Sequence, residues 1–189
     1  YDRVHLSEFF AGRSPEDLAL TTREHYRELG VEAHFGDRVA SIDRDGKTLT
    51  TDSGKQFAYD KLVLATGSYP FVPPVKGNDL EPCVVYRTID DLGIIQAQAK
   101  GGKVGVVVGG GLLGLECANA VKNLGLETHV VEFAPGLMGV QLDGGGSAML
   151  RRKIEALGVT VHTSKATQVI EQDALGESRL RMQFADGGS

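Results

Sequence analysis

One stretch of this chain constrains its fold more than any other, because it combines an apolar run, closely spaced glycines, a helical pattern and a second apolar run. Residues 103–108 have the composition of a buried strand, and residues 109–114 read Gly-Gly-Gly-Leu-Leu-Gly. Residues 128–131 form a second strand-like run that ends at Glu132. Strand, glycine turn, helix, strand and terminal acid, in this order, are what a dinucleotide-binding βαβ unit requires. The sequence therefore predicts a Rossmann-like unit that binds NAD.

Each glycine of the GxGxxG motif has a mechanical reason. We expect Gly109 to let the backbone turn sharply, Gly111 to leave room for a pyrophosphate, and Gly114 to let the helix pack closely on the sheet. The start of the helix would offer unpaired N–H groups to the phosphates, so that Leu112 and Leu113 need contribute only backbone. A tight turn without any ligand stays open as an alternative, because glycine is common here, with 25 among 189 residues.

Glu132 predicts which dinucleotide the unit prefers. Its carboxylate is placed to accept hydrogen bonds from the adenosine ribose diol and to repel a 2′-phosphate. The residues that follow, Phe133, Ala134 and Pro135, offer no arginine for such a phosphate. We expect NADH to be favoured over NADPH.

Composition excludes several other classes of function. The net charge of −5 and the lack of a long basic run argue against nucleic acid as a partner. No apolar stretch approaches the roughly 20 residues that span a bilayer, and no secretory signal opens the chain, so we expect a cytoplasmic protein without a membrane partner. Cys83 and Cys117 form no CxxC pair, and the histidines lack metal-ligand spacing. We therefore expect neither a dithiol relay nor a metal site.

The remaining chain divides into patterns typical of short helices and strands. A helix is expected from a cap near Ser14 to about Gly30, and later helices at 89–99 and 146–157, with Ile154 and Leu157 facing inward. Further expected strands span 31–35, 38–43, 47–51, 56–58, 159–162, 168–172 and 180–184. Residues 59–68 are expected to form a buried strand that ends in a small-residue turn. Neither end of the chain matches a natural domain boundary, so we expect a piece of something larger.

Three segments carry a family resemblance: Leu-Val-Leu-Ala-Thr-Gly at 62–67, Tyr-Arg-Thr-Ile-Asp-Asp-Leu at 86–92, and 109–118. Together they resemble the two-dinucleotide-binding flavoprotein oxidoreductases, and within them the front part of the large-subunit family of assimilatory NAD(P)H-nitrite reductases. The resemblance implies an α/β fold with a Rossmann-like NAD-binding domain at 76–189, whose last strands are truncated. It also implies an incomplete FAD-binding domain at 1–75 that lacks the first phosphate-loop unit.

The same resemblance implies an activity. Members take hydride from NADH onto FAD and pass electrons to an iron–sulfur cluster and sirohaem, which would lie downstream of this chain. Glu116 matches a catalytic position near the nicotinamide, although the lysine that partners it in related reductases is replaced by Glu8. The implied FAD contacts are Arg3, Val39, Ala65, Thr66 and Gly67. From the residues alone, a surface arginine and an ordinary strand end explain Arg3 and Thr66-Gly67 equally well.

Three functions therefore compete. The first is an electron-input module that belongs to a larger nitrite reductase subunit, is not active alone, and binds NADH and FAD. The second is an NADH-dependent ferredoxin or rubredoxin reductase, or an NADH oxidase. The third is a noncatalytic module for NADH binding or for oligomerisation, such as a homodimer. The lack of a cysteine pair argues against a disulfide reductase, which needs a dithiol beside the flavin.

Overall fold

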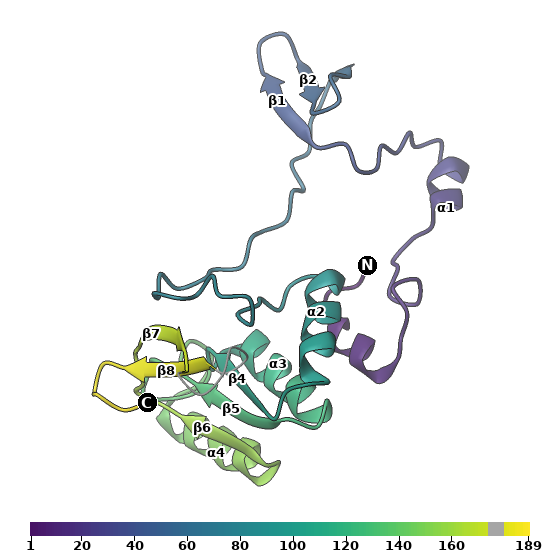
Figure 1. Ribbon diagram of the computed structural model, residues 1–189. Helices are drawn as coiled ribbons and strands as arrows, with labels where there is room; N and C mark the ends of the chain where they lie inside the picture. The colour runs from purple at the N-terminus through teal and green to yellow at the C-terminus, as the bar shows by residue number, and fades with distance from the viewer. Residues whose placement is uncertain (174–179) are drawn as a thin grey trace. The chain divides into compact units, whose positions relative to one another are not determined.

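The computed structural model describes residues 1–173 and 180–189, which form two compact units (Figure 1). The first unit combines Tyr1–Leu18 with Pro70–Ser189, and the second is Ala19–Tyr69. The N-terminal residues thus pack with the glycine-rich half of the chain, although most of the first third lies between them in sequence.

A parallel sheet is the centre of the first unit. Its strands β4 (Val104–Val108), β5 (Glu127–Val131) and β6 (Val159–His162) lie in that order, with Val107 opposite Val130 and Val130 opposite Val161. The connecting helices α3 (Leu112–Asn123) and α4 (Gly144–Ala156) pack on this sheet (Figure 1). The predicted order of strand, helix and strand is confirmed.

The core of the first unit joins this sheet to two further helices. The 3₁₀ helix η1 (Leu6–Ala11) and the helix α2 (Ile89–Ala99) pack together, and η1 also contacts α3. The buried side chains that form the core come from all of these elements: Leu6, Leu92, Ile95, Val107, Ala118, Val121, Val130, Leu137, Val159 and Val161. The start of α2 is fixed by a capping box, in which Thr88 and Asp91 exchange side-chain to backbone hydrogen bonds of 3.2 and 2.7 Å.

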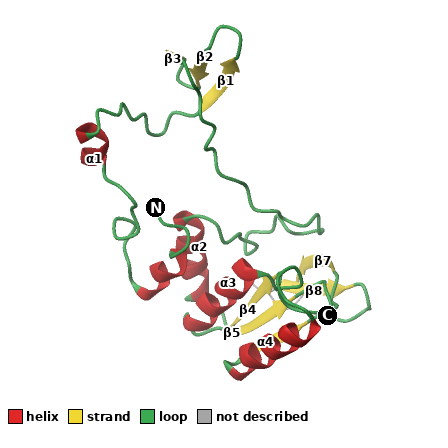
Figure 2. Ribbon diagram, turned by 180° about the vertical axis from the view of Figure 1, so that it is seen from behind, coloured by secondary structure: helices red, strands yellow, loops and turns green. Residues whose placement is uncertain are grey.

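An antiparallel hairpin, β7 (Thr167–Gln172) and β8 (Leu180–Phe184), completes the first unit as predicted. In the second unit, β1 (Val39–Asp43), β2 (Thr48–Thr51) and β3 (Gln56–Ala58) form the expected antiparallel meander (Figure 2). A short helix, α1 (Arg23–Glu28), precedes them. Within the described ranges, no helix combines the length and the apolar character needed to cross a membrane.

The predicted helix from Ser14 to Gly30 is wrong over its first half, whereas its second half contains α1 and ends near Gly30 as expected. Ser14 and Asp17 do exchange the hydrogen bonds of a capping box, at 2.9 and 3.1 Å, but only a turn follows. The carbonyl of Leu18 accepts its hydrogen bond from the N–H of Asp2, at 2.6 Å, so it is not used to extend a helix. The helix that forms starts later, after Thr22, whose hydroxyl caps it.

Three other expectations are also wrong. Residues 31–35 form no strand, and residues 59–68 run without a strand partner among the described residues, which leaves Val63 84% exposed. An apolar run has strand composition whether or not a neighbouring strand is available to pair with it. Leu157 is 57% exposed because α4 ends before it, whereas Ile154 packs against the core as predicted.

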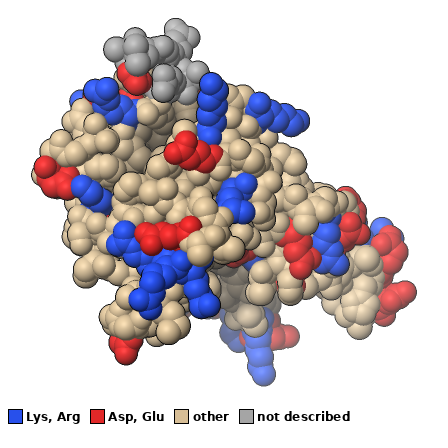
Figure 3. All heavy atoms as spheres, turned by 90° about the horizontal axis from the view of Figure 1, so that it is seen from below, with Lys and Arg blue, Asp and Glu red and all other residues tan. Residues whose placement is uncertain are grey.

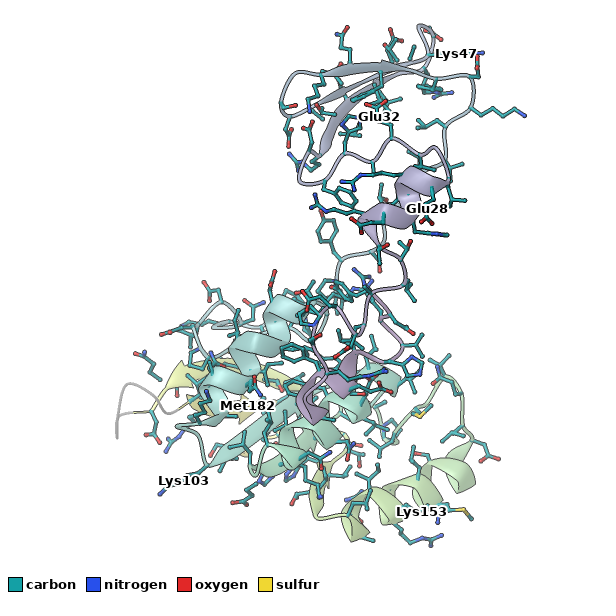
Figure 4. All side chains as sticks on the ribbon, turned by 90° about the vertical axis from the view of Figure 1, so that its right-hand side faces the viewer. Glu28, Glu32, Lys47, Lys103, Lys153 and Met182 are labelled. Carbon is teal, nitrogen blue, oxygen red and sulfur yellow. The ribbon has the colours of Figure 1, made fainter. Side chains whose placement is uncertain are left out.

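Charged side chains of both signs are mixed on the face drawn in Figure 3, where lysine and arginine lie among aspartate and glutamate. Lys153 extends from α4 away from the sheet, as Figure 4 shows. The basic triplet 151–153 is thus split, since Arg152 and Lys153 are exposed while Arg151 is half-buried and donates to the carbonyl of Val161 at 3.0 Å.

Candidate dinucleotide site

The glycine loop lies where β4 ends and α3 begins. Gly109 has a φ of 117°, a conformation that glycine adopts easily and other residues rarely do, and its N–H donates to the carbonyl of Val131 at 2.8 Å. Gly111 is the N-cap of α3 and supplies no side-chain cap. The first N–H groups of α3 therefore face outward without a side-chain acceptor from the capping residue, which is the arrangement that suits an anion.

The structure gives each motif glycine a distinct surrounding. A Cβ added to Gly114 would lie 1.9 Å from the carbonyl oxygen of Gly109, so only glycine allows α3 to approach the loop this closely. A Cβ added to Gly111 would meet nothing within 4 Å, which leaves open space above the loop. The sharp turn predicted at Gly109 and the close packing predicted at Gly114 are both present.

Glu132 is held against the glycine loop by both of its carboxylate oxygens. One accepts a hydrogen bond from the N–H of Gly110 at 2.5 Å, and the other accepts from the N–H of Ala134 at 2.6 Å. The backbone of Glu132 extends the pairing of β5 with β6, because its N–H donates to the carbonyl of His162 at 2.8 Å. The half-buried carboxylate is thus fixed at the mouth of the loop.

A second loop also closes on the glycine turn. The N–H of Met138 donates to the carbonyl of Gly110 at 2.9 Å, and Leu137 is fully buried beneath it. A Cβ added to Gly110 would lie 2.5 Å from a methyl carbon of Leu137. Sequence reasoning missed this role, although a glycine at position 110, where the motif is open to any residue, was an available signal.

Two leucines line the start of α3. Leu112 is 66% exposed and Leu113 is 51% exposed, so neither side chain is used by the core. The sequence predicts that these two residues contribute only their backbone. Their two apolar side chains lie in solvent beside the open helix terminus.

Glu116 has an unexpected partner. Its Oε1 accepts a hydrogen bond from the hydroxyl of Tyr86 at 3.0 Å, whereas Glu8, at the position where related reductases carry lysine, pairs with Arg13. Burial of Tyr86 and its bond to Glu116 raise the pKa of that phenol, while a hydrogen bond from Ser7 acts in the opposite direction. Sequence reasoning did not find Tyr86, because thirty positions separate it from Glu116.

The residues expected to contact a flavin fall in both units. Val39 and Thr66 line one shallow, mainly apolar cavity of about 340 Å³ in the second unit. Ala65 and Gly67 flank Thr66 in an exposed segment, and Gly67 has a φ of 72°. Arg3 is exposed and belongs to the first unit.

Comparison with known proteins gives a family for the whole chain. Residues 1–189 match the family described as pyridine nucleotide-disulphide oxidoreductase. The chain is 59% identical over 189 residues to the nitrite reductase [NAD(P)H] large subunit of Klebsiella oxytoca, covering 100% of this chain and 19% of that protein. It is 53% identical to the nitrite reductase (NADH) large subunit of Escherichia coli K12, covering 99% of this chain and 22% of that protein.

Solved structures support the same fold. A ferredoxin reductase for the CYP199A2 system from Rhodopseudomonas palustris superposes with a TM-score of 0.90 at 28% identity, covering 100% of this chain and 46% of that one. A NAD-dependent persulfide reductase from A. fulgidus gives a TM-score of 0.88 at 27% identity, covering 98% and 36%. The chain spans about a fifth of the length of its nitrite reductase relatives, 19% and 22%.

Proposed function

The chain belongs to the pyridine nucleotide-disulphide oxidoreductase family, and from this premise we propose that it is the NADH-accepting, FAD-dependent input module of a larger nitrite reductase subunit. The identities of 59% and 53% to nitrite reductase large subunits support this choice of subunit. The sirohaem and iron–sulfur cluster of the whole subunit are assigned to the part outside residues 1–189.

The glycine loop and Glu132 carry the proposal for NADH. The diphosphate binds at the open N-terminus of α3, over the space that Gly111 leaves free. The adenosine ribose binds at Glu132, whose oxygens can each accept a second hydrogen bond because each has two lone pairs. A 2′-phosphate at this place would meet a fixed negative charge, so NADH is preferred to NADPH.

The residues proposed to contact the flavin are Val39, Ala65, Thr66 and Gly67 of the second unit and Arg3 of the first unit. The apolar cavity lined by Val39 and Thr66 fits a flat aromatic group of the cofactor, and Arg3 fits its phosphates. When bound, FAD supplies the chemistry that takes up hydride and releases single electrons. We assign FAD binding to residues 1–75 and NADH binding to residues 76–189. This division is by function and differs from the division by packing, in which residues 1–18 belong with residues 70–189.

Glu116 is proposed to act near the nicotinamide. It lies in the second turn of α3, on the helix whose N-terminus binds the diphosphate. A carboxylate there accepts a hydrogen bond from a ligand amide and so orients the reactive ring. Leu112 and Leu113 add apolar surface that excludes water around the ligand.

Titration with NADH and NADPH tests the proposal directly. The purified chain is titrated by calorimetry with each nucleotide, alongside Glu132→Gln, which keeps the side-chain shape, removes the charge and gives up one of the two hydrogen bonds from the backbone N–H groups of Gly110 and Ala134. We expect the wild-type chain to bind NADH more tightly than NADPH, and the variant to lose most of this preference. A wild-type chain with no affinity for either nucleotide would overturn the proposed function.

A second experiment examines the flavin. The absorption spectrum of the chain is recorded after incubation with FAD and gel filtration, and again after NADH is added. Retained flavin that bleaches with NADH supports an electron-input module. A colourless chain that still binds NADH favours the noncatalytic binding module instead.

One other candidate has an observation in its favour. The TM-score of 0.90 to a ferredoxin reductase supports a module that passes electrons to a separate iron–sulfur protein. The two functions share every residue discussed above, and they differ in whether the acceptor centres belong to the same polypeptide. The mass and the metal content of the purified whole subunit distinguish them.

A further inference from the structure

The hydrogen bond between Tyr86 and Glu116 joins two elements that are distant in sequence. Tyr86 precedes α2, and Glu116 lies on α3 close to its open N-terminus. The phenol donates and the carboxylate accepts, at 3.0 Å. Neither side chain is fully buried, so the pair lies between the core of the first unit and solvent.

The position of Tyr86 is fixed from several sides. Its ring packs against the core of the first unit, and the side chain of Ser7 in η1 bonds to its oxygen. Two residues later, the capping box of Thr88 and Asp91 fixes the backbone at the start of α2. A phenol held in this way is a rigid donor, since little side-chain freedom remains to be lost when the bond forms.

A phenol also differs in kind from a cationic partner. Tyrosine is a neutral donor, so it orients the carboxylate without cancelling its charge. The bond uses Oε1 of Glu116, and the second carboxylate oxygen can accept from a ligand N–H. With Glu8 paired to Arg13, the described residues give Glu116 a neutral partner at the place where a lysine is expected from related reductases.

We propose that Tyr86 is a positioning residue, which holds Glu116 so that its carboxylate accepts a hydrogen bond from the carboxamide of NADH. This rests on the proposed function, because it deepens the assignment of Glu116 to the nicotinamide end of the site. The proposal predicts that the phenol matters for ligands that carry the nicotinamide and not for ligands that lack it.

The test compares two ligands with four forms of the chain. NADH contains the nicotinamide, and ADP-ribose shares the adenosine and the diphosphate but lacks the nicotinamide. Dissociation constants are measured by calorimetry for the wild type, Tyr86→Phe, Glu116→Ala and the double variant. Tyr26→Phe is the matched control, because Tyr26 belongs to the second unit, where it packs against Phe35, whereas Tyr86 and Glu116 belong to the first unit.

We expect Tyr86→Phe to weaken NADH about five- to tenfold, the net size of one typical hydrogen bond, and to leave ADP-ribose unchanged. In the Glu116→Ala background, Tyr86→Phe should have no further effect, because the phenol acts through that carboxylate. Equal weakening of both ligands, additive effects of the two substitutions, or unchanged NADH affinity in Tyr86→Phe would each overturn the positioning role. A wild-type chain that binds neither ligand would instead overturn the proposed function, so the two failures are distinguishable.

Discussion

The carboxylate of Glu132 accepts a hydrogen bond from the backbone N–H of Gly110, and the two atoms are 2.5 Å apart. The acid at the end of β5 therefore has a structural role beside its proposed role in binding the ribose, because it fixes the turn between β4 and α3. Its other oxygen holds Ala134, so one side chain joins the glycine loop to the segment after β5. A substitution here should affect the affinity for dinucleotide and the order of the loop together.

Replacing Glu132 with alanine should weaken NADH by roughly 1 to 3 kcal/mol, the range for hydrogen bonds to a charged group. The same change removes the negative charge that opposes a 2′-phosphate, so NADPH should lose less affinity or gain some. Calorimetric titration with both nucleotides measures the difference. Unchanged discrimination between them would exclude Glu132 as the ribose ligand.

Gly114 and Gly93 should respond to alanine with opposite signs. A Cβ at Gly114 would lie 1.9 Å from a backbone oxygen, so Gly114→Ala should lower the free energy of unfolding by about 1–3 kcal/mol or more. Gly93 lies inside α2 with open space where a Cβ would stand, so Gly93→Ala should raise it by about 0.5–1 kcal/mol. Urea unfolding followed by circular dichroism measures both. Destabilisation of similar size by both changes would contradict the close approach at Gly114.

The stability of the chain should fall as the pH falls below about 6.5, in part because of His162. Burial lowers the pKa of His162 first, and the charges of His129, Lys165 and Arg151 lower it further. Between the lowered pKa and the ordinary value, the unfolded chain binds more protons than the folded one, so stability is present above that range and is lost on acidification.

The variant His162→Gln isolates this effect. His162 accepts or donates one hydrogen bond with His129, at 3.0 Å between the ring nitrogens, and glutamine keeps a polar side chain there. Melting temperatures are measured from pH 5 to pH 7.5 for both forms. The variant should lose less stability on acidification than the wild type. Parallel curves would show that the lowered pKa of His162 does not contribute.

The parts of this fold that the sequence predicts are those set by local patterns. The glycine motif, the apolar runs and the acid at Glu132 lie within thirty residues of each other. Together they fit one arrangement, in which a strand, a turn, a helix and a second strand follow one another. The capping signal at Ser14 is equally local, and its hydrogen bonds form as expected. The helix that should follow fails because the carbonyl of Leu18 bonds to Asp2, a contact that no local pattern reveals.

Pairing between distant segments is the part that the sequence does not predict. Residues 59–68 have the composition of a buried strand, yet burial depends on a neighbouring strand that lies elsewhere in a sheet. The partner of Glu116 is similarly nonlocal, because Tyr86 reaches it only after α2 and α3 pack on η1. The same limit applies to Gly110, whose need for glycine arises from Leu137 on another loop.

Leu137 connects the stability of the chain to the proposed site, and its truncation should affect both. The side chain is fully buried against Gly110, and the next residue, Met138, donates to the carbonyl of Gly110 at 2.9 Å. Leu137→Ala should lower the free energy of unfolding by about 2–5 kcal/mol, through lost burial and the cavity that remains. It should also weaken the binding of NADH, because the loop that fixes Gly110 loses its anchor.

Val140→Ala is the control on the same loop, since Val140 is 94% exposed and its truncation should change stability by no more than about 0.5 kcal/mol. Urea unfolding and calorimetry with NADH measure the two effects separately. A destabilised Leu137→Ala with unchanged NADH affinity would show that the loop after β5 supports the core alone and that the glycine turn keeps its shape without it.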